Sequence, residues 1–128
     1  MNPYAFITGA TSGIGLATAK ALAASHYDLV LAARNTKKLA SVKADIEKES
    51  GVKVTTYPLD VQDREAIKEV TTKVLDTFGA PDVLVNDAGL ARGLGPYQDT
   101  APEDTMEMID TSIKGLFLVT RAFLPAMV

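Results

Sequence analysis

The fold of this 128-residue sequence is decided by one stretch, Thr8-Gly9-Ala10-Thr11-Ser12-Gly13-Ile14-Gly15. An apolar, strand-like run at 4–8 leads into it, and a helix pattern rich in Ala and Leu opens within it. Gly9 permits a tight turn off the strand, Gly13 removes a Cβ where a pyrophosphate would lie, and Gly15 lets the helix approach the sheet closely. The free N–H groups and the positive end of the helix dipole then favour an anion. A glycine turn without a ligand is the alternative, but the strand before and the helix after favour a dinucleotide-phosphate loop.

Strand-like and helix-like segments alternate four times along the chain. Short β-branched and apolar runs predict strands at 4–8, 29–33, 52–57 and 83–86, and apolar periodicity predicts helices at 14–25, 36–50, 64–78 and 100–124. Pro125 is expected to end or kink the last helix. Such alternation is typical of an α/β fold with an open parallel sheet covered on both faces. With right-handed crossovers, it predicts a three-layer, Rossmann-like, doubly wound single domain over residues 1–128 with strand order 3-2-1-4.

The residues at the helix ends agree with these boundaries. Asn35 and Asp63 can cap the second and third helices, because their side chains accept hydrogen bonds from free N–H groups. Gly51 and Gly79 follow the ends of the same two helices, where a left-handed residue is wanted. The stretch Thr100-Ala101-Pro102-Glu103 resembles a capping box and predicts that the last helix begins near Thr100.

Composition excludes several classes of protein. The chain is 47% hydrophobic and 23% charged, has a net charge of −3 and contains no Cys. Disulfides, zinc–cysteine sites and thiol nucleophiles are therefore excluded, and an acidic chain predicts no nucleic-acid partner. No apolar stretch reaches the ~20 residues of a membrane span, and the start of the chain lacks a signal-peptide pattern, so we expect a cytoplasmic protein without a membrane partner. His26, the only histidine, follows the first helix pattern, where a cation suits the dipole, and no ligand cluster near it predicts a metal site.

Arg34 predicts the choice of cofactor. It follows the second strand, nineteen residues after Gly15. An NAD site wants an acid near this point for the ribose 2′-hydroxyl, whereas a cation suits the 2′-phosphate of NADP. We therefore expect NADP in preference to NAD. The alternative is a solvated Arg at a strand end that binds nothing.

Taken together, these residues resemble the short-chain dehydrogenase/reductase family. The glycine stretch looks like the family's cofactor loop, and Leu59-Asp60-Val61 lies where the family has an Asp that contacts the adenine. The stretch Asn86-Asp87-Ala88-Gly89 looks like the family's Asn-Asn-Ala-Gly motif. Residues 108–127 look like the family's fourth helix. The details most resemble NADP-dependent members that act on small hydroxy acids or related alcohols. The loop and the resemblance together predict these cofactor-binding residues: Gly9, Thr11, Ser12, Gly13, Ile14, Gly15, Arg34, Asp60, Val61, Asn86, Ala88 and Gly89.

The sequence departs from the family pattern at three points. None of its four Tyr residues is followed by Lys four positions later, so the family's catalytic Tyr-x-x-x-Lys is absent, and the family's catalytic Ser has no counterpart before Val128. Ser112 stands where the fourth helix of the family has an active-site Asn, and we expect it to be an ordinary helix Ser. Asp87 replaces an Asn. An ionised carboxylate there would disfavour a nearby pyrophosphate, although it can instead accept hydrogen bonds from local N–H groups.

These departures predict binding without catalysis. The resemblance covers the N-terminal half of the family's domain, and we expect a truncated, engineered dinucleotide-binding module that binds NADP(H) weakly, with no catalytic residue and no metal site. A folding or assembly scaffold without a ligand is one alternative. The other is an oxidoreductase half that is active only when a second polypeptide supplies the missing C-terminal half.

A homodimer is also expected. The fourth strand, 83–86, would lie at the edge of the sheet with no Pro or charge at its centre, and such an edge invites pairing with another chain. The segment 115–124 of the last predicted helix is apolar almost all round, so we expect this helix to be buried on more than one side. We therefore predict a two-fold symmetric dimer joined through the fourth strand, the fourth helix or both.

Overall fold

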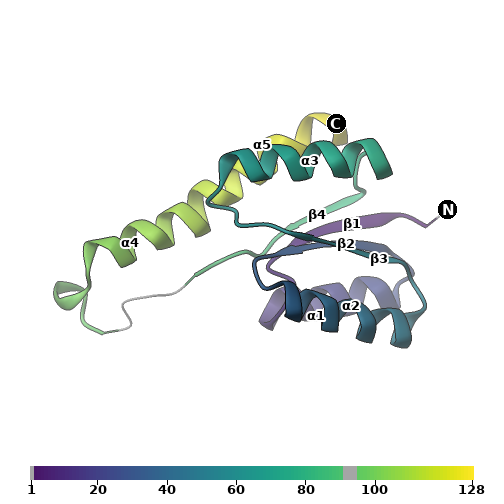
Figure 1. Ribbon diagram of the computed structural model, residues 1–128, viewed down its shortest axis with the longest axis horizontal. Helices are drawn as coiled ribbons and strands as arrows, with labels where there is room; N and C mark the ends of the chain where they lie inside the picture. Colours follow the sequence, from purple (N-terminus) through teal and green to yellow (C-terminus); the bar gives the residue numbers. More distant parts are fainter. Residues whose placement is uncertain (1, 91–94) are drawn as a thin grey trace.

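Four parallel strands form the centre of the molecule. The computed structural model describes residues 2–90 and 95–128. The strands are β1 (Tyr4–Thr8), β2 (Asp28–Ala33), β3 (Val54–Pro58) and β4 (Val83–Asn86). They lie in the order β3-β2-β1-β4, and each pair is parallel (Figure 1). The predicted fold class and strand order are confirmed, and β4 forms one edge of the sheet.

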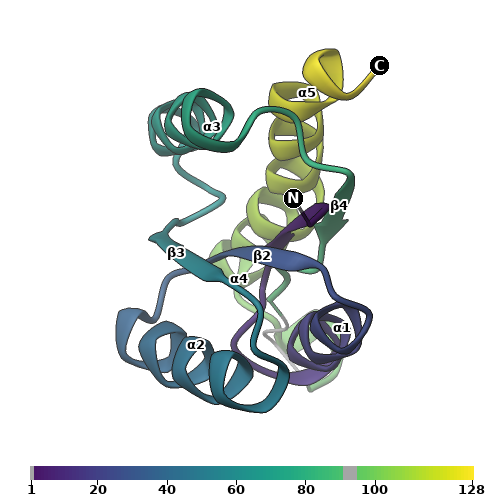
Figure 2. The same ribbon diagram turned by 90° about the vertical axis from the view of Figure 1, so that its right-hand side faces the viewer.

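Helices cover both faces of this sheet. Figure 2 shows α1 (Gly13–Ala24) and α2 (Thr36–Ser50) on one face, with α3 (Arg64–Phe78) and α5 (Gly115–Met127) on the other. A short 3₁₀ turn, η1 (Tyr97–Asp99), precedes α4 (Pro102–Ile109), which extends away from the sheet in Figure 1. The three layers follow from the right-handed crossovers that join parallel strands.

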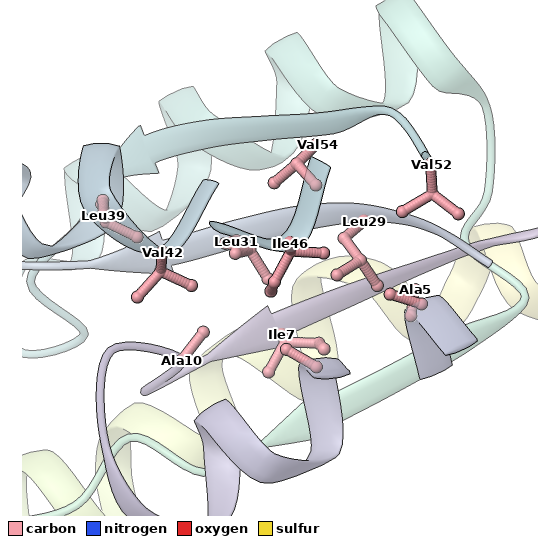
Figure 3. Close-up of a cluster of buried hydrophobic side chains, with 12 residues drawn as sticks. Ala5, Ile7, Ala10, Leu29, Leu31, Leu39, Val42, Ile46, Val52 and Val54 are labelled. Atoms are coloured by element: carbon pink, nitrogen blue, oxygen red, sulfur yellow. The ribbon is translucent and has the colours of Figure 1, made fainter. Parts of the chain in front are cut away.

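Two hydrophobic clusters fill the spaces between the layers. Ala5 and Ile7 of β1 point towards α1 and α2, together with side chains of β2 and α2 (Figure 3). Phe6 points to the other face, where its ring centroid lies 4.4 Å from that of Phe123 of α5. All five β1 residues are buried, because successive side chains enter opposite clusters. This explains why the strand appears in the sequence as one continuous apolar run.

The end of the sheet opposite the glycine loop is closed by Tyr4. Its hydroxyl donates to the carbonyl of Gly79 at 2.6 Å, and its N–H donates to the Asp82 carboxylate at 2.9 Å. Burial, and then the negative charge of Asp82, raise the pKa of Tyr4 to about 12. The phenol therefore stays protonated through the neutral range and keeps donating its hydrogen bond.

The capping residues of α2 and α3 are those expected. Asn35 accepts from the Lys38 N–H at 3.0 Å, and Asp63 accepts from the Ala66 N–H at 3.1 Å. Gly51 adopts the left-handed conformation predicted for it, with φ 70° and ψ 8°. Gly79 also has a positive φ, 75°, but its ψ of −163° lies outside the left-handed helical region, so that prediction is wrong in detail. The chain turns directly there into the segment that precedes β4.

The last helix differs from its prediction at both ends and in its middle. Its N-cap is Ala101, with no side-chain cap, because Pro102 has the fixed φ that suits the first helical position. The capping box at Thr100 is therefore wrong. The helix also passes through Pro125 to Met127, since a Pro this close to a C-terminus removes only one hydrogen bond. Between α4 and α5 lies a π-helical segment, η2 (Asp110–Lys114), which apolar periodicity did not indicate.

His26 closes α1 in a conformation that suits glycine. The C-cap is Ser25, and His26 follows it with φ 66°. The His26 N–H donates to Ala23 and the Tyr27 N–H donates to Leu22, which is the hydrogen-bond pattern of a Schellman motif. The sequence predicts His26 at the end of this helix as a cation that suits the dipole. The structure adds that its backbone adopts a left-handed conformation, which few residues other than glycine adopt.

Replacing His26 by glycine should stabilise the fold. His26→Gly removes a Cβ from a left-handed residue, which offsets the greater flexibility of glycine in the unfolded chain and is expected to add about 1 kcal/mol. Urea denaturation followed by circular dichroism measures this change. Ser25→Gly, at the C-cap with φ −92°, is the matched control and should not stabilise. A lower free energy of unfolding for His26→Gly would contradict the assignment.

Candidate cofactor site

A cavity of about 940 Å³ lies at the carboxyl ends of the four strands. Open α/β sheets bind their ligands at this end, where the strand order reverses, and here that point lies between β1 and β4. The cavity lining combines the glycine loop, the ends of β2 and β3, the loop after β4 and one residue of η2. These residues are Gly9, Thr11, Ser12, Gly13, Ile14, Ala32, Ala33, Arg34, Asn35, Leu59, Asp60, Val61, Asp87, Ala88, Gly89, Leu90 and Thr111.

The fold brings most of the predicted cofactor-binding residues into this lining. Two of them, Gly15 and Asn86, lie outside it. Asn86 Nδ2 donates to Thr120 Oγ1 at 3.0 Å, so its side chain joins the end of β4 to α5. Gly15 lies in the first turn of α1 and packs against the main chain of Gly9.

Each glycine of the loop occupies its position for a different structural reason. Gly9 has φ 67°, and a Cβ there would lie 2.5 Å from the Asp87 carbonyl oxygen. A Cβ on Gly15 would meet the Gly9 carbonyl oxygen and would lie 2.7 Å from Asp87 Oδ2, which confirms the expected close approach. Gly13 has φ 57°, and a Cβ there would meet nothing within 4 Å, so the space beside it is open. Ser12, the N-cap of α1, makes no side-chain cap hydrogen bond. This opening beside a helix N-terminus fits a phosphate group.

Thr8 joins the loops that follow β1 and β4. It is 1% exposed, and its hydroxyl accepts from the Asp87 and Ala88 N–H groups at 3.2 Å each. The same hydroxyl lies 3.5 Å from the Val85 carbonyl oxygen, to which it donates. The glycine pattern and the family resemblance do not indicate this role of Thr8. The sequence signal for it is a hydroxyl residue at the end of the first strand, which is predicted to lie beside the fourth strand.

The far side of the cavity carries Arg34 and Asp60. Arg34 is exposed, and within residues 2–90 and 95–128 it forms no ion pair. Asp60 Oδ1 accepts from the Gln62 N–H at 2.9 Å, which fixes the turn after β3. Val61 is buried, and a Cβ on Gly115 would lie 2.7 Å from its Cγ2, so α5 packs closely against this turn.

The π segment supplies two hydroxyl groups near the cavity. Ser112 Oγ accepts from the Leu90 N–H at 3.4 Å and so holds the loop after β4. The expectation of an ordinary helix Ser is therefore too simple. Thr111 is 5% exposed, lines the cavity, and its hydroxyl has no hydrogen-bond partner among the described residues. Sequence reasoning missed Thr111, because it lies in the π-helical segment, which apolar periodicity does not indicate.

Comparison with known proteins identifies the family. The model of the short chain dehydrogenase family matches residues 3–128. The chain belongs to this family. Among curated short-chain dehydrogenases, it is 39% identical over 128 residues to sulfoacetaldehyde reductase 2 of Chromohalobacter salexigens, covering 100% of this chain and 50% of that protein. It is also 39% identical over 122 residues to the NADP-dependent 3-hydroxy acid dehydrogenase YdfG of Salmonella typhi, covering 95% of this chain and 48% of that protein.

Solved structures of family members share this fold. An alcohol dehydrogenase from the archaeon Thermococcus sibiricus, complexed with 5-hydroxy-NADP, superposes with a TM-score of 0.93 at 37% identity, covering 99% of this chain and 54% of that one. L-sorbose reductase from Gluconobacter frateurii, complexed with NADPH and L-sorbose, gives a TM-score of 0.90 at 30% identity. This match covers 98% of this chain and 48% of that one. The chain thus spans about half the length of the relatives it matches.

Membrane-spanning helices and clusters of metal ligands are both absent from the described residues. Within residues 2–90 and 95–128, none of the helices has the length and apolar character needed to cross a bilayer. The same ranges hold no group of three or more His, Asp or Glu side chains placed to bind a metal ion.

Proposed function

We propose that this chain is a dinucleotide-binding module that binds NADP(H) weakly and does not catalyse hydride transfer by itself. The observation that carries the proposal is the single cavity that joins the open N-terminus of α1 to the exposed Arg34. Relatives named as NADP-dependent, and related structures with NADP or NADPH bound, support the choice of cofactor.

Each part of the cofactor has a chemical counterpart in the cavity. The helix N-terminus beside Gly13 suits the pyrophosphate, because free N–H groups and the helix dipole favour an anion. Arg34 suits the 2′-phosphate of NADP, with which a guanidinium forms paired hydrogen bonds. Asp60 lies beneath the far side of the cavity, where the family resemblance places the adenine. When bound, the cofactor supplies a hydride. The Tyr and Lys of the family motif are not among these 128 residues, so the proposal assigns binding alone.

Calorimetry with NADP and NAD tests both the binding and the role of Arg34. The parent chain is expected to bind NADP about tenfold more tightly than NAD, since one charge-assisted pair contributes about 1.4 kcal/mol at an exposed site. Arg34→Ala should bring the two affinities together by weakening NADP binding alone. Lys38→Ala, an exposed cation in the first turn of α2, is the matched control and should keep the preference. If neither dinucleotide bound the parent, the chain would be a scaffold and the proposal would fail.

The same chain is proposed to form a homodimer through α5 and the β4 edge. Among the described strands, β4 pairs only with β1. Five large apolar side chains of the α4–η2–α5 helix are exposed: Met106 (54%), Ile113 (51%), Leu116 (40%), Phe117 (67%) and Leu124 (46%). Apart from Leu116, their positions are symmetric about Gly115, at nine and two residues on either side. An antiparallel copy related by a two-fold axis near Gly115 would therefore place Met106 opposite Leu124 and Ile113 opposite Phe117.

A further inference from the structure

The carboxylate of Asp87 lies against the start of α1. Its Oδ2 is 2.7 Å from the position that a Cβ on Gly15 would occupy, and Gly15 belongs to the first turn of that helix. Asp87 also lines the cavity next to the glycine loop. A negative charge therefore already lies at the helix N-terminus that the proposed function assigns to the pyrophosphate.

The main chain of Asp87 is fixed at this position. Its N–H donates to Thr8 Oγ1, and its carbonyl is packed so closely against Gly9 that a Cβ there would lie 2.5 Å from the oxygen. Within the described residues, no hydrogen bond or ion pair neutralises its carboxylate. Arg34, the cation of the cavity, lies at the end of β2, beyond the Gly9 turn.

We infer that Asp87 is the residue that keeps dinucleotide affinity low, because its carboxylate takes the place of a phosphate in the field of the α1 N-terminus. The inference rests on the proposed function and makes it more specific. Two negative charges a few ångströms apart at one helix N-terminus repel each other, which offsets the attraction of the helix dipole for the second. The same carboxylate stabilises the free protein, because a negative charge near a helix N-terminus is favourable and Ser12 gives this terminus no side-chain cap.

Asp87→Asn separates these two effects, because it removes the charge and keeps the shape. Calorimetry should give NADP binding about tenfold tighter than for the parent, while the melting temperature falls by about 2 °C. Adenosine 2′-monophosphate carries the phosphate that suits Arg34 but no pyrophosphate, so its affinity should change less than about twofold. Asp87→Ser is a second neutral variant, in case the amide disturbs packing. Asp76→Asn, which removes an exposed charge from α3 on the other face of the sheet, is the matched control and should change neither affinity.

The possible outcomes are distinct. Equal NADP affinity for the parent and both neutral variants would overturn the inference and leave the proposed function standing. An equal gain for NADP and for adenosine 2′-monophosphate would also overturn it, because the charge would then act through the general field of the protein. Absence of binding in the parent and in every variant would overturn the proposed function, and this inference with it.

Discussion

Gly9→Ala is expected to destabilise the protein by about 3 kcal/mol. An alanine at φ 67° costs roughly 1–2 kcal/mol, and overpacking a filled site costs about 1–3 kcal/mol more. The new methyl group would meet backbone atoms of Asp87 and Ala88, which Thr8 holds in place. Neither side can move without breaking the contact between the ends of β1 and β4.

Two other glycines distinguish the cost of backbone strain at a positive φ from the cost of a steric clash with the new methyl group. Gly13 and Gly51 have φ values of 57° and 70°, but a Cβ at either position would meet nothing within 4 Å. Gly13→Ala and Gly51→Ala should therefore each cost only about 1 kcal/mol. Urea denaturation of the three variants at one temperature makes the comparison. If all three lost the same free energy of unfolding, the close contact between Gly9 and the β4 loop would play no part.

Mixtures of single-cysteine variants should cross-link in pairs that identify the dimer. The parent chain has no Cys, so every thiol is a chosen one. In an equal mixture, Met106→Cys and Leu124→Cys are expected to cross-link about half of the chains with a short bis-maleimide, because random pairing leaves the rest in dimers of one variant. Ile113→Cys mixed with Phe117→Cys should cross-link more completely, because each of these positions also lies about 6 Å along the helix from its own copy. Met106→Cys alone should remain uncross-linked, because its copy would lie about 27 Å away along the antiparallel helix.

A mismatched pair and the native mass complete this test. Leu124→Cys alone is such a mismatched pair, because its copy would also lie about 27 Å away, so cross-linking it as efficiently as the matched mixtures would contradict the two-fold arrangement. Light scattering at tens of micromolar should give about twice the 13.6 kDa of one chain. A monomeric mass would show that another partner, or solvent, covers this face.

Most of the scaffold could be predicted because its signals are local. The apolar run of β1, the side-chain caps Asn35 and Asp63, and the left-handed Gly51 each follow from chemistry within a few residues. Strand order then followed from rules on crossovers, which depend on the alternation of elements and not on any single side chain.

The predictions that failed depended on longer-range packing. The π segment is one such case, since Gly115 against Val61 and Ser112 against Leu90 involve residues far apart in sequence. Thr111 entered the cavity lining for the same reason. Asp87 was noticed as a charge at a strand end, but its position against Gly15 depends on how α1 approaches β4. Such contacts have no period in the sequence that would reveal them.

The π segment amounts to one residue inserted into an α-helix. Removing that residue would rotate α4 and α5 relative to each other by about 100°. Thr111 lines the cavity, while Val119 and Phe123 of the same continuous helix are buried against the sheet. A regular α-helix along the same axis would not direct these side chains to both surfaces at once. The length of the chain between residues 110 and 114 is therefore as constrained as its composition. A single deletion there would misalign the helix, whereas most substitutions at its exposed positions would leave its direction unchanged.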